Sequence, residues 1–274
     1  MYTQHGKWTG PAAFFAAHPV FSHAEFVEAH TARGRSERTS NSLLRWYLGT
    51  GRLLRIRRGL YATVSVGMDA AAFSADPYLI AAKSRDDAVI SYHTALSFHG
   101  KAYSVWRRYQ CLTAERARPF TYGAQEFVSL QAPSQIRALP DFGGGVIRCA
   151  HAGDEVRVTT LERTLADVFH APEHGGGWEE IWRSLEMVEF FDLRAVVDCT
   201  LRLRSDVTAA RVGFFLEQHR EQLMVEDAHL EPLLQHAPRQ PRYLGPQRTS
   251  GRLISRWNLV VPESVLQRRW EDPQ

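Results

Sequence analysis

The sequence is poor in cysteine and contains no long apolar run, and both absences restrict the kind of protein it encodes. Its three cysteines, Cys111, Cys149 and Cys199, are too far apart to form a Cys-x-x-Cys metal knuckle, and their odd number does not suit a disulfide framework. No apolar stretch is long enough to span a bilayer, and the first ten residues lack the apolar segment of a signal peptide. These absences predict a cytoplasmic protein with reduced thiols and no membrane-spanning helix.

The motifs of several enzyme classes are also absent. The chain has neither a P-loop nor the G-x-S-x-G turn that carries the nucleophile of α/β-hydrolases. His170 and His174 have a spacing that could place two metal ligands on one helix face, but Pro172 and the glycines that follow are expected to end the helix first. We therefore expect no enzyme activity, no catalytic residue, no metal site and no cofactor.

The basic residues are unevenly distributed. Only three of the 33 basic residues are lysines, and the whole chain has a net charge of +3. Eight arginines and a single acidic residue, Glu37, lie within 31–61, so this segment carries seven net positive charges and the remainder carries four net negative ones. A basic segment beside a mildly acidic body is typical of a nucleic-acid-binding module joined to another domain. The arginines are Arg33, Arg35, Arg38, Arg45, Arg52, Arg55, Arg57 and Arg58.

Two helices are predicted before the basic segment. Pro11, shortly after Thr9, is suited to the first turn of a helix because its missing N–H is not needed there. Ser22 and Glu25 have the spacing of a capping box, in which each side chain bonds the other residue's backbone N–H. The residues beside them, Phe21 and Phe26, occupy the two positions of a hydrophobic staple.

The basic segment itself predicts a third helix and a hairpin. Over 37–48, the helical period places Arg38, Asn41, Ser42 and Arg45 on one face and the leucines with Tyr47 on the other. A strand over 52–56, a basic turn at 57–59 and a strand over 60–64 follow. This order predicts a winged helix-turn-helix over roughly 9–66. The residues expected to contact DNA are Arg33, Arg35, Arg38, Thr39, Ser40, Asn41, Ser42, Arg45, Arg55, Arg57 and Arg58.

The rest of the chain predicts a larger mixed body, so that the whole protein belongs to the α+β class. We place the boundary after residue 74, with a winged helix-turn-helix domain over 1–74 and a C-terminal α/β domain over 75–274. A second capping box is expected at Thr159 and Glu162, where a helix follows the last central strand. Strands are predicted at 104–113, 119–131, 146–149, 156–158 and 252–261, and helices at 177–188, 191–202, 207–222 and 227–235.

Several short segments, taken in order, resemble the AbiEi-type antitoxins of abortive-infection (type IV) toxin–antitoxin systems. This resemblance implies a transcriptional autorepressor that binds double-stranded DNA at an inverted repeat in its own promoter, as a dimer or cooperatively. It also implies a partner, a cognate nucleotidyltransferase-like toxin that the protein counters directly or indirectly, and a cytoplasmic, nucleoid-associated location. The segments are Gly51–Tyr61, Asp76–Ala81, Ala88–Gly100, Thr160–Asp167, Arg211–Glu217 and Trp257–Pro262.

Other functions stay open at this level. The arginines could form a solvated face, and winged helices also serve as protein-binding modules. The chain could be a stand-alone winged-helix regulator whose body binds a ligand or dimerises. A DNA-processing nuclease is less favoured, because metal-dependent nucleases need clustered carboxylates, often with a lysine, and the pair Glu179-Glu180 has no lysine nearby.

Overall fold

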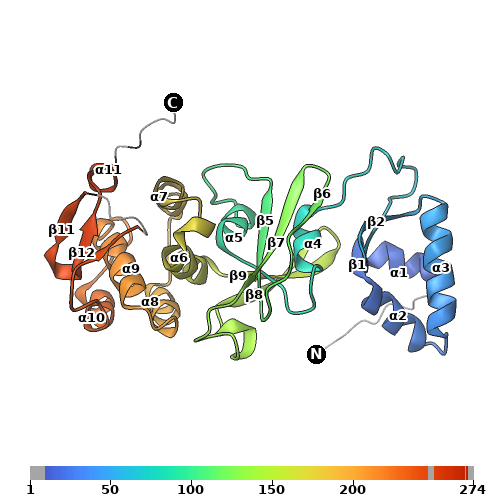
Figure 1. The fold of residues 1–274 in the computed structure, drawn as a ribbon, viewed down its shortest axis with the longest axis horizontal. Coiled ribbons are helices and arrows are strands. Elements are labelled where there is room, and N and C mark those ends of the chain that lie inside the picture. The colour runs from blue at the N-terminus through green and yellow to red at the C-terminus, as the bar shows by residue number, and fades with distance from the viewer. Residues whose placement is uncertain (1–9, 246–249, 269, 271–274) are drawn as a thin grey trace.

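The computed structural model describes residues 10–245, 250–268 and 270, and it arranges them as a row of layers (Figure 1). Three helices lie at one end, next to a small sheet. A larger central sheet follows, and a group of helices with a third sheet forms the other end. Thr9, where the first helix was expected to start, lies outside the described residues.

The N-terminal unit contains three helices and a three-stranded antiparallel sheet of strand order β1-β3-β2. The predicted capping box is present: Ser22 Oγ accepts a hydrogen bond from the Glu25 N–H at 3.1 Å, and the Glu25 carboxylate accepts one from the Ser22 N–H at 2.7 Å. The helix at the basic segment ends one residue beyond its predicted end. The elements are α1 (Pro11–Ala17), β1 (Val20–Ser22), α2 (His23–Thr31), α3 (Glu37–Gly49), β2 (Leu53–Arg57) and β3 (Leu60–Thr63).

Both faces of this small sheet are buried. Because successive side chains of a strand point to opposite faces, Phe21 and Tyr61 pack against the N-terminal helices. Val20, Leu60 and Ala62 point the other way and join an apolar cluster with residues of the body. The predicted boundary after residue 74 stays a prediction, but this cluster crosses it.

Ion pairs also join the N-terminal unit to the body. Lys83 Nζ lies 2.8 Å from Glu25 Oε1 and 3.1 Å from Asp154 Oδ2, and His18 Nδ1 lies 3.5 Å from the same Asp154 oxygen. Burial opposes the charge of Lys83, but the bonds to Glu25 and Asp154 outweigh it and raise the pKa of the ammonium group. Lys83 is thus held charged between the two parts of the chain.

The central sheet has six strands in the order β6-β7-β5-β4-β9-β8. It is mixed: β4 pairs with β9 and β5 with β7 in parallel, while the other pairs are antiparallel. One face, with helix α4 (Pro77–Ala82), is buried toward the N-terminal unit. The opposite face packs against α5 (Tyr92–Phe98) and the helices that follow. The strands are β4 (Val89–Ile90), β5 (Arg108–Thr113), β6 (Phe120–Tyr122), β7 (Gln125–Gln131), β8 (Val146–His151) and β9 (Asp154–Thr159).

The C-terminal part contains the largest apolar core, in which the fully buried Trp182 and Trp257 take part. Its helices surround this core and carry a small sheet of order β10-β12-β11. The helices are α6 (Leu161–His170), α7 (Trp178–Glu186), α8 (Leu193–Arg202), α9 (Asp206–Gln218), α10 (Asp227–Gln235) and α11 (Glu263–Leu266). The strands are β10 (Arg242–Tyr243), β11 (Arg252–Ile254) and β12 (Leu259–Val261).

The structure corrects three details of the sequence-based prediction. The segment 119–131 forms two strands, because a turn with Gly123 at φ +58° separates β6 from β7. The segment 252–261 is likewise divided, by a short 3-10 helix. The residue that caps α6 is Thr160, whose side chain accepts from the Arg163 N–H, whereas Thr159 is the buried last residue of β9.

A buried ion pair anchors α6 within the body. Arg163 Nε lies 2.8 Å from Asp167 Oδ1, and both side chains are almost completely buried. The same guanidinium donates to the carbonyl oxygens of Phe142 and Gly144, at 2.8 and 2.9 Å. Since these two residues lie in the loop before β8, the pair fixes that loop on the helix.

Replacing Asp167 by Asn should destabilise the protein strongly, because the Arg163 charge would stay buried without a counter-charge. We expect a loss of about 3–5 kcal/mol in the free energy of unfolding, measured by denaturant titration. The matched control is Glu155→Gln in the exposed pair with Arg148, where the loss should stay below about 1 kcal/mol. Equal losses in the two variants would contradict this role of the pair.

Candidate nucleic-acid interface

Helix α3 lies on the outer side of the N-terminal unit, away from the body (Figure 1). It buries Ser40, Leu44 and Tyr47, which recur at the spacing of one helix face. The opposite face is open to solvent. The exposed side chains on it include Arg38, Thr39, Ser42, Arg45 and Trp46.

The arginines of this region are mostly exposed, as the sequence predicts. Arg38 and Arg45 are exposed on α3, and Arg33 and Arg35 are exposed in the turn between α2 and α3. The Arg33 guanidinium donates to the carbonyl oxygen of Ala29 at the end of α2. Two of these arginines affect His30. Burial lowers the pKa of its imidazole, and the positive charges of Arg35 and Arg33 lower that pKa further. Several cations are therefore gathered at one end of α3.

The polar side chains on α3 are held in defined orientations. Ser42 Oγ donates to the Arg38 carbonyl oxygen at 3.0 Å and keeps its lone pairs as acceptors. Thr39 Oγ1 lies 2.9 Å from Ser36 Oγ. Asn41 Oδ1 lies 2.6 Å from His23 Nε2 on α2. If His23 donates in that contact, both N–H groups of the Asn41 amide are available to a ligand.

Two of the predicted contact residues lie elsewhere. Ser40 is buried on the inner face of α3, and its hydroxyl donates to the Ser36 carbonyl oxygen at 3.2 Å. Arg57 faces the body: its guanidinium donates to the Ser84 carbonyl oxygen and lies 4.5 Å from the ring centroid of Phe120. Burial lowers the pKa of Arg57. Neither side chain is placed to contact a ligand bound on α3.

The two other hairpin arginines are open to solvent. Arg55 and Arg58 are exposed, in contrast to Arg57 between them. A register shift between Arg55 and Arg57 interrupts the pairing of β2 with β3 at this point. A bulge of this kind changes the direction in which the side chains on either side of it point, here those of Arg55 and Arg57. The tip of the hairpin is thus partly bound to the body and partly exposed.

Trp46 is a surface residue that the sequence analysis did not single out. The residue is 56% exposed, although tryptophan is highly buried on average. At about 100° per residue, Trp46 falls about 40° from Ser42, so it lies on the polar face of the helix. The helical period was therefore the signal that could have identified it.

The comparisons with known proteins bear on the fold. No protein-family model matches the chain, and no curated protein matches its sequence. The fold is similar to that in the crystal structure of the Rv2827c protein from Mycobacterium tuberculosis, with 17% sequence identity and a TM-score of 0.55. The similarity covers 93% of this chain and 92% of that one. The chain is thus a mixed α+β protein with several small sheets.

Two further observations concern the described residues only. No helix among them is long and apolar enough to cross a membrane. They also contain no group of three or more His, Cys, Asp or Glu side chains that could hold a metal ion.

Replacing Arg57 by Ala should lower the stability of the protein, because a half-buried cation loses its contacts with Ser84 and Phe120. We expect a loss of about 1–3 kcal/mol in the free energy of unfolding, measured by denaturant titration. Arg58→Ala is the matched control, since it removes an exposed arginine from the same turn and should change stability by less than about 0.5 kcal/mol. A neutral Arg57→Ala would show that these contacts do not hold the hairpin.

Proposed function

We propose that the protein binds double-stranded DNA through α3, and that its N-terminal unit is a winged helix-turn-helix. The observation that carries the proposal is the exposed face of α3, which presents Arg38, Ser42 and Arg45 to solvent on the side away from the body. The order of elements supports it: helix, strand, two helices and a hairpin, with β1 completing the sheet. In winged helices the third helix enters the major groove.

In this arrangement the residues divide by what they contact. Asn41 and Arg45, near the middle of α3, read base edges in the major groove: the Asn41 N–H groups donate to base acceptors, and the Arg45 guanidinium pairs with guanine. Arg33 and Arg35, in the turn before the helix, contact phosphates, which position the protein without reading sequence. Arg55 and Arg58 reach the flanking backbone from the hairpin. Trp46 adds an apolar contact beside the groove.

DNA binding should depend steeply on salt. About five phosphate contacts predict a slope near −4 to −5 in a plot of log affinity against log salt concentration. Arg35→Ala should reduce the steepness by about 0.9, because one fewer counterion is released. The control is Arg148→Ala, which removes an exposed arginine of the body and should leave the slope unchanged. Fluorescence anisotropy with a labelled duplex measures both. Affinity without salt dependence would contradict the proposal.

The biological role we propose follows from the resemblance to AbiEi-type antitoxins. The protein represses its own promoter at an inverted repeat, as a dimer or cooperatively, and it counters a nucleotidyltransferase-like toxin directly or indirectly. It acts in the cytoplasm, on the nucleoid. The four net negative charges outside 31–61 suit contact with a basic partner.

Repression and neutralisation should be separable by mutation. Arg38→Ala combined with Arg58→Ala removes two exposed cations, so it should abolish footprint protection of an inverted repeat upstream of the gene. The same variant should still protect cells that express the partner toxin from a foreign promoter, an arrangement in which repression cannot affect the outcome. A folded double mutant that fails to protect would show that neutralisation also needs α3 or the hairpin.

This test uses the full chain for a structural reason. A fragment that starts near Ala75 would expose Leu79 and Ile80, which are fully buried in the cluster shared with the N-terminal sheet. Its failure to protect cells could then reflect unfolding. Point substitutions of exposed arginines avoid that ambiguity, because they leave the shared core intact.

A further inference from the structure

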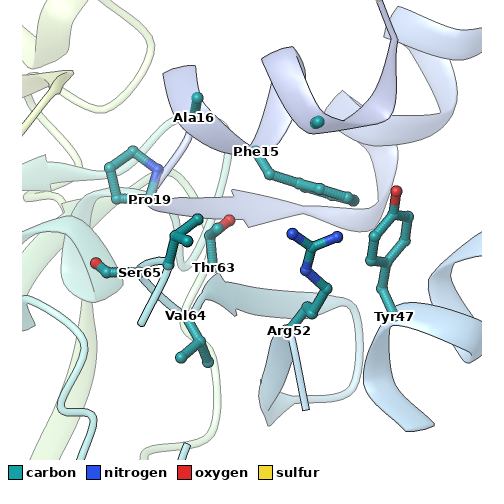
Figure 2. A pocket seen from close by; sticks show the side chains of 10 residues that line it. Phe15, Ala16, Pro19, Tyr47, Arg52, Thr63, Val64 and Ser65 are labelled. Atoms are coloured by element: carbon teal, nitrogen blue, oxygen red, sulfur yellow. The ribbon is translucent and has the colours of Figure 1, made fainter. Parts of the chain in front are cut away.

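A cavity of about 340 Å³ lies within the N-terminal unit, between α1, the end of α3 and the chain that follows β3 (Figure 2). Its size is at the lower end of the range for small-molecule sites. Small residues on α1, Ala12 and Ala16, leave the space open on one side. The other lining residues include Phe15, Pro19, Tyr47 and Arg52, together with the segment 63–66.

The lining combines aromatic rings with one exposed cation, Arg52. Phe15 and Tyr47 meet edge to face, with ring centroids 4.7 Å apart. Figure 2 shows the Arg52 guanidinium extending toward these two rings, and it lies 6.0 Å from the Tyr47 ring centroid. Within the described residues, the Arg52 side chain has no hydrogen bond and no ion pair, and the lining contains no Asp or Glu. Because Arg52 is exposed and the lining holds no acidic side chain to pair with it, the mostly apolar cavity is complementary to an apolar anion.

We propose that this cavity binds a small aromatic carboxylate. The flat ring of the ligand packs between Phe15 and Pro19, and its carboxylate pairs with the fork of N–H groups on Arg52. Guanidinium and carboxylate form two parallel hydrogen bonds, a geometry that a neutral amide does not reproduce. The ligand is thus recognised by its charge at one end and its ring at the other.

The position of the cavity connects it to DNA binding, a connection that rests on the proposed function. Tyr47 belongs to α3, and Arg52 follows the helix directly, with its backbone N–H bonded to the Tyr47 carbonyl oxygen at 3.1 Å. A ligand held between α1 and Arg52 therefore contacts the inner face of the helix whose outer face carries Arg45. Binding that fixes or tilts this end of α3 changes the affinity for DNA, because any ligand that prefers one orientation of the helix shifts the equilibrium toward it.

The binding experiment uses 2-naphthoate and its neutral isostere 2-naphthamide, titrated into the full chain by calorimetry without DNA. We expect 2-naphthoate to bind at least about tenfold more tightly than the amide, the usual advantage of a charge-assisted pair. Arg52→Gln should reduce the affinity for 2-naphthoate to that for the amide. Ala16→Phe should abolish binding of both, since Ala16 is an exposed helix residue whose replacement fills the cavity and leaves the core unchanged.

The control variant is Arg148→Gln, which removes an exposed arginine of the body and should bind 2-naphthoate as the unchanged protein does. Thermal unfolding checks that each variant is folded. Equal affinity for acid and amide, no binding of either, or binding that survives Ala16→Phe would each overturn the proposed site.

The second arm measures DNA affinity at saturating 2-naphthoate. We expect a change of at least about threefold in the unchanged protein and none in Ala16→Phe, within the usual range of coupling between sites. If 2-naphthoate binds and the DNA affinity does not change, the site stands and the coupling is wrong. If the protein binds no DNA at all, the proposed function and the coupling are both overturned, while the calorimetric result still decides the site.

Discussion

The arrangement of the molecule depends on the burial of the small N-terminal sheet from both sides. Leu60 and Ala62 of β3 lie in the cluster shared with α4 and the central sheet, whereas Tyr61 between them packs under the N-terminal helices. Since strand side chains alternate, a slip of one residue in register would turn each set of side chains toward the wrong one of the two cores. This register places the helices on the outer side, and α3 faces solvent for that reason. Lys83, paired with Glu25 and Asp154, fixes the same arrangement electrostatically.

The same docking limits what the hairpin can do. A hairpin that projects into solvent is free to follow a DNA backbone, but here Arg57 is bound to Ser84 and Phe120 of the body. The cation at the tip therefore contributes to the contact between sheet and body. Under the proposed function, DNA recognition by the N-terminal unit therefore relies more on α3 and less on the hairpin.

Helix caps and helix faces could be predicted from the sequence, whereas contacts between residues far apart in the chain could not. The capping box at Ser22 and the two faces of α3 follow from spacings of three or four residues, and the structure contains both. Strand β1 has only three residues, too few for a periodic pattern, and exists because β3 pairs with it. The partner of Arg57 lies 27 positions away, at Ser84, so no local pattern could predict it. Thr159 and Thr160 both fit a cap, and only the end of β9 distinguishes them.

Packed aromatic rings of the N-terminal unit support the inner face of α3. Phe15 lies against Tyr47 on one side and stacks on Phe26 on the other, with ring centroids 4.7 and 5.5 Å apart. Close packing of rings transmits displacement, because a packed core does not deform continuously. The cavity beside Phe15 lies between α1 and the end of α3, and the small side chains of Ala12 and Ala16 line it on the α1 side. Under the coupling proposed above, a ligand that fills this space acts on the packing that supports α3, and through it on the orientation of the arginines on the helix.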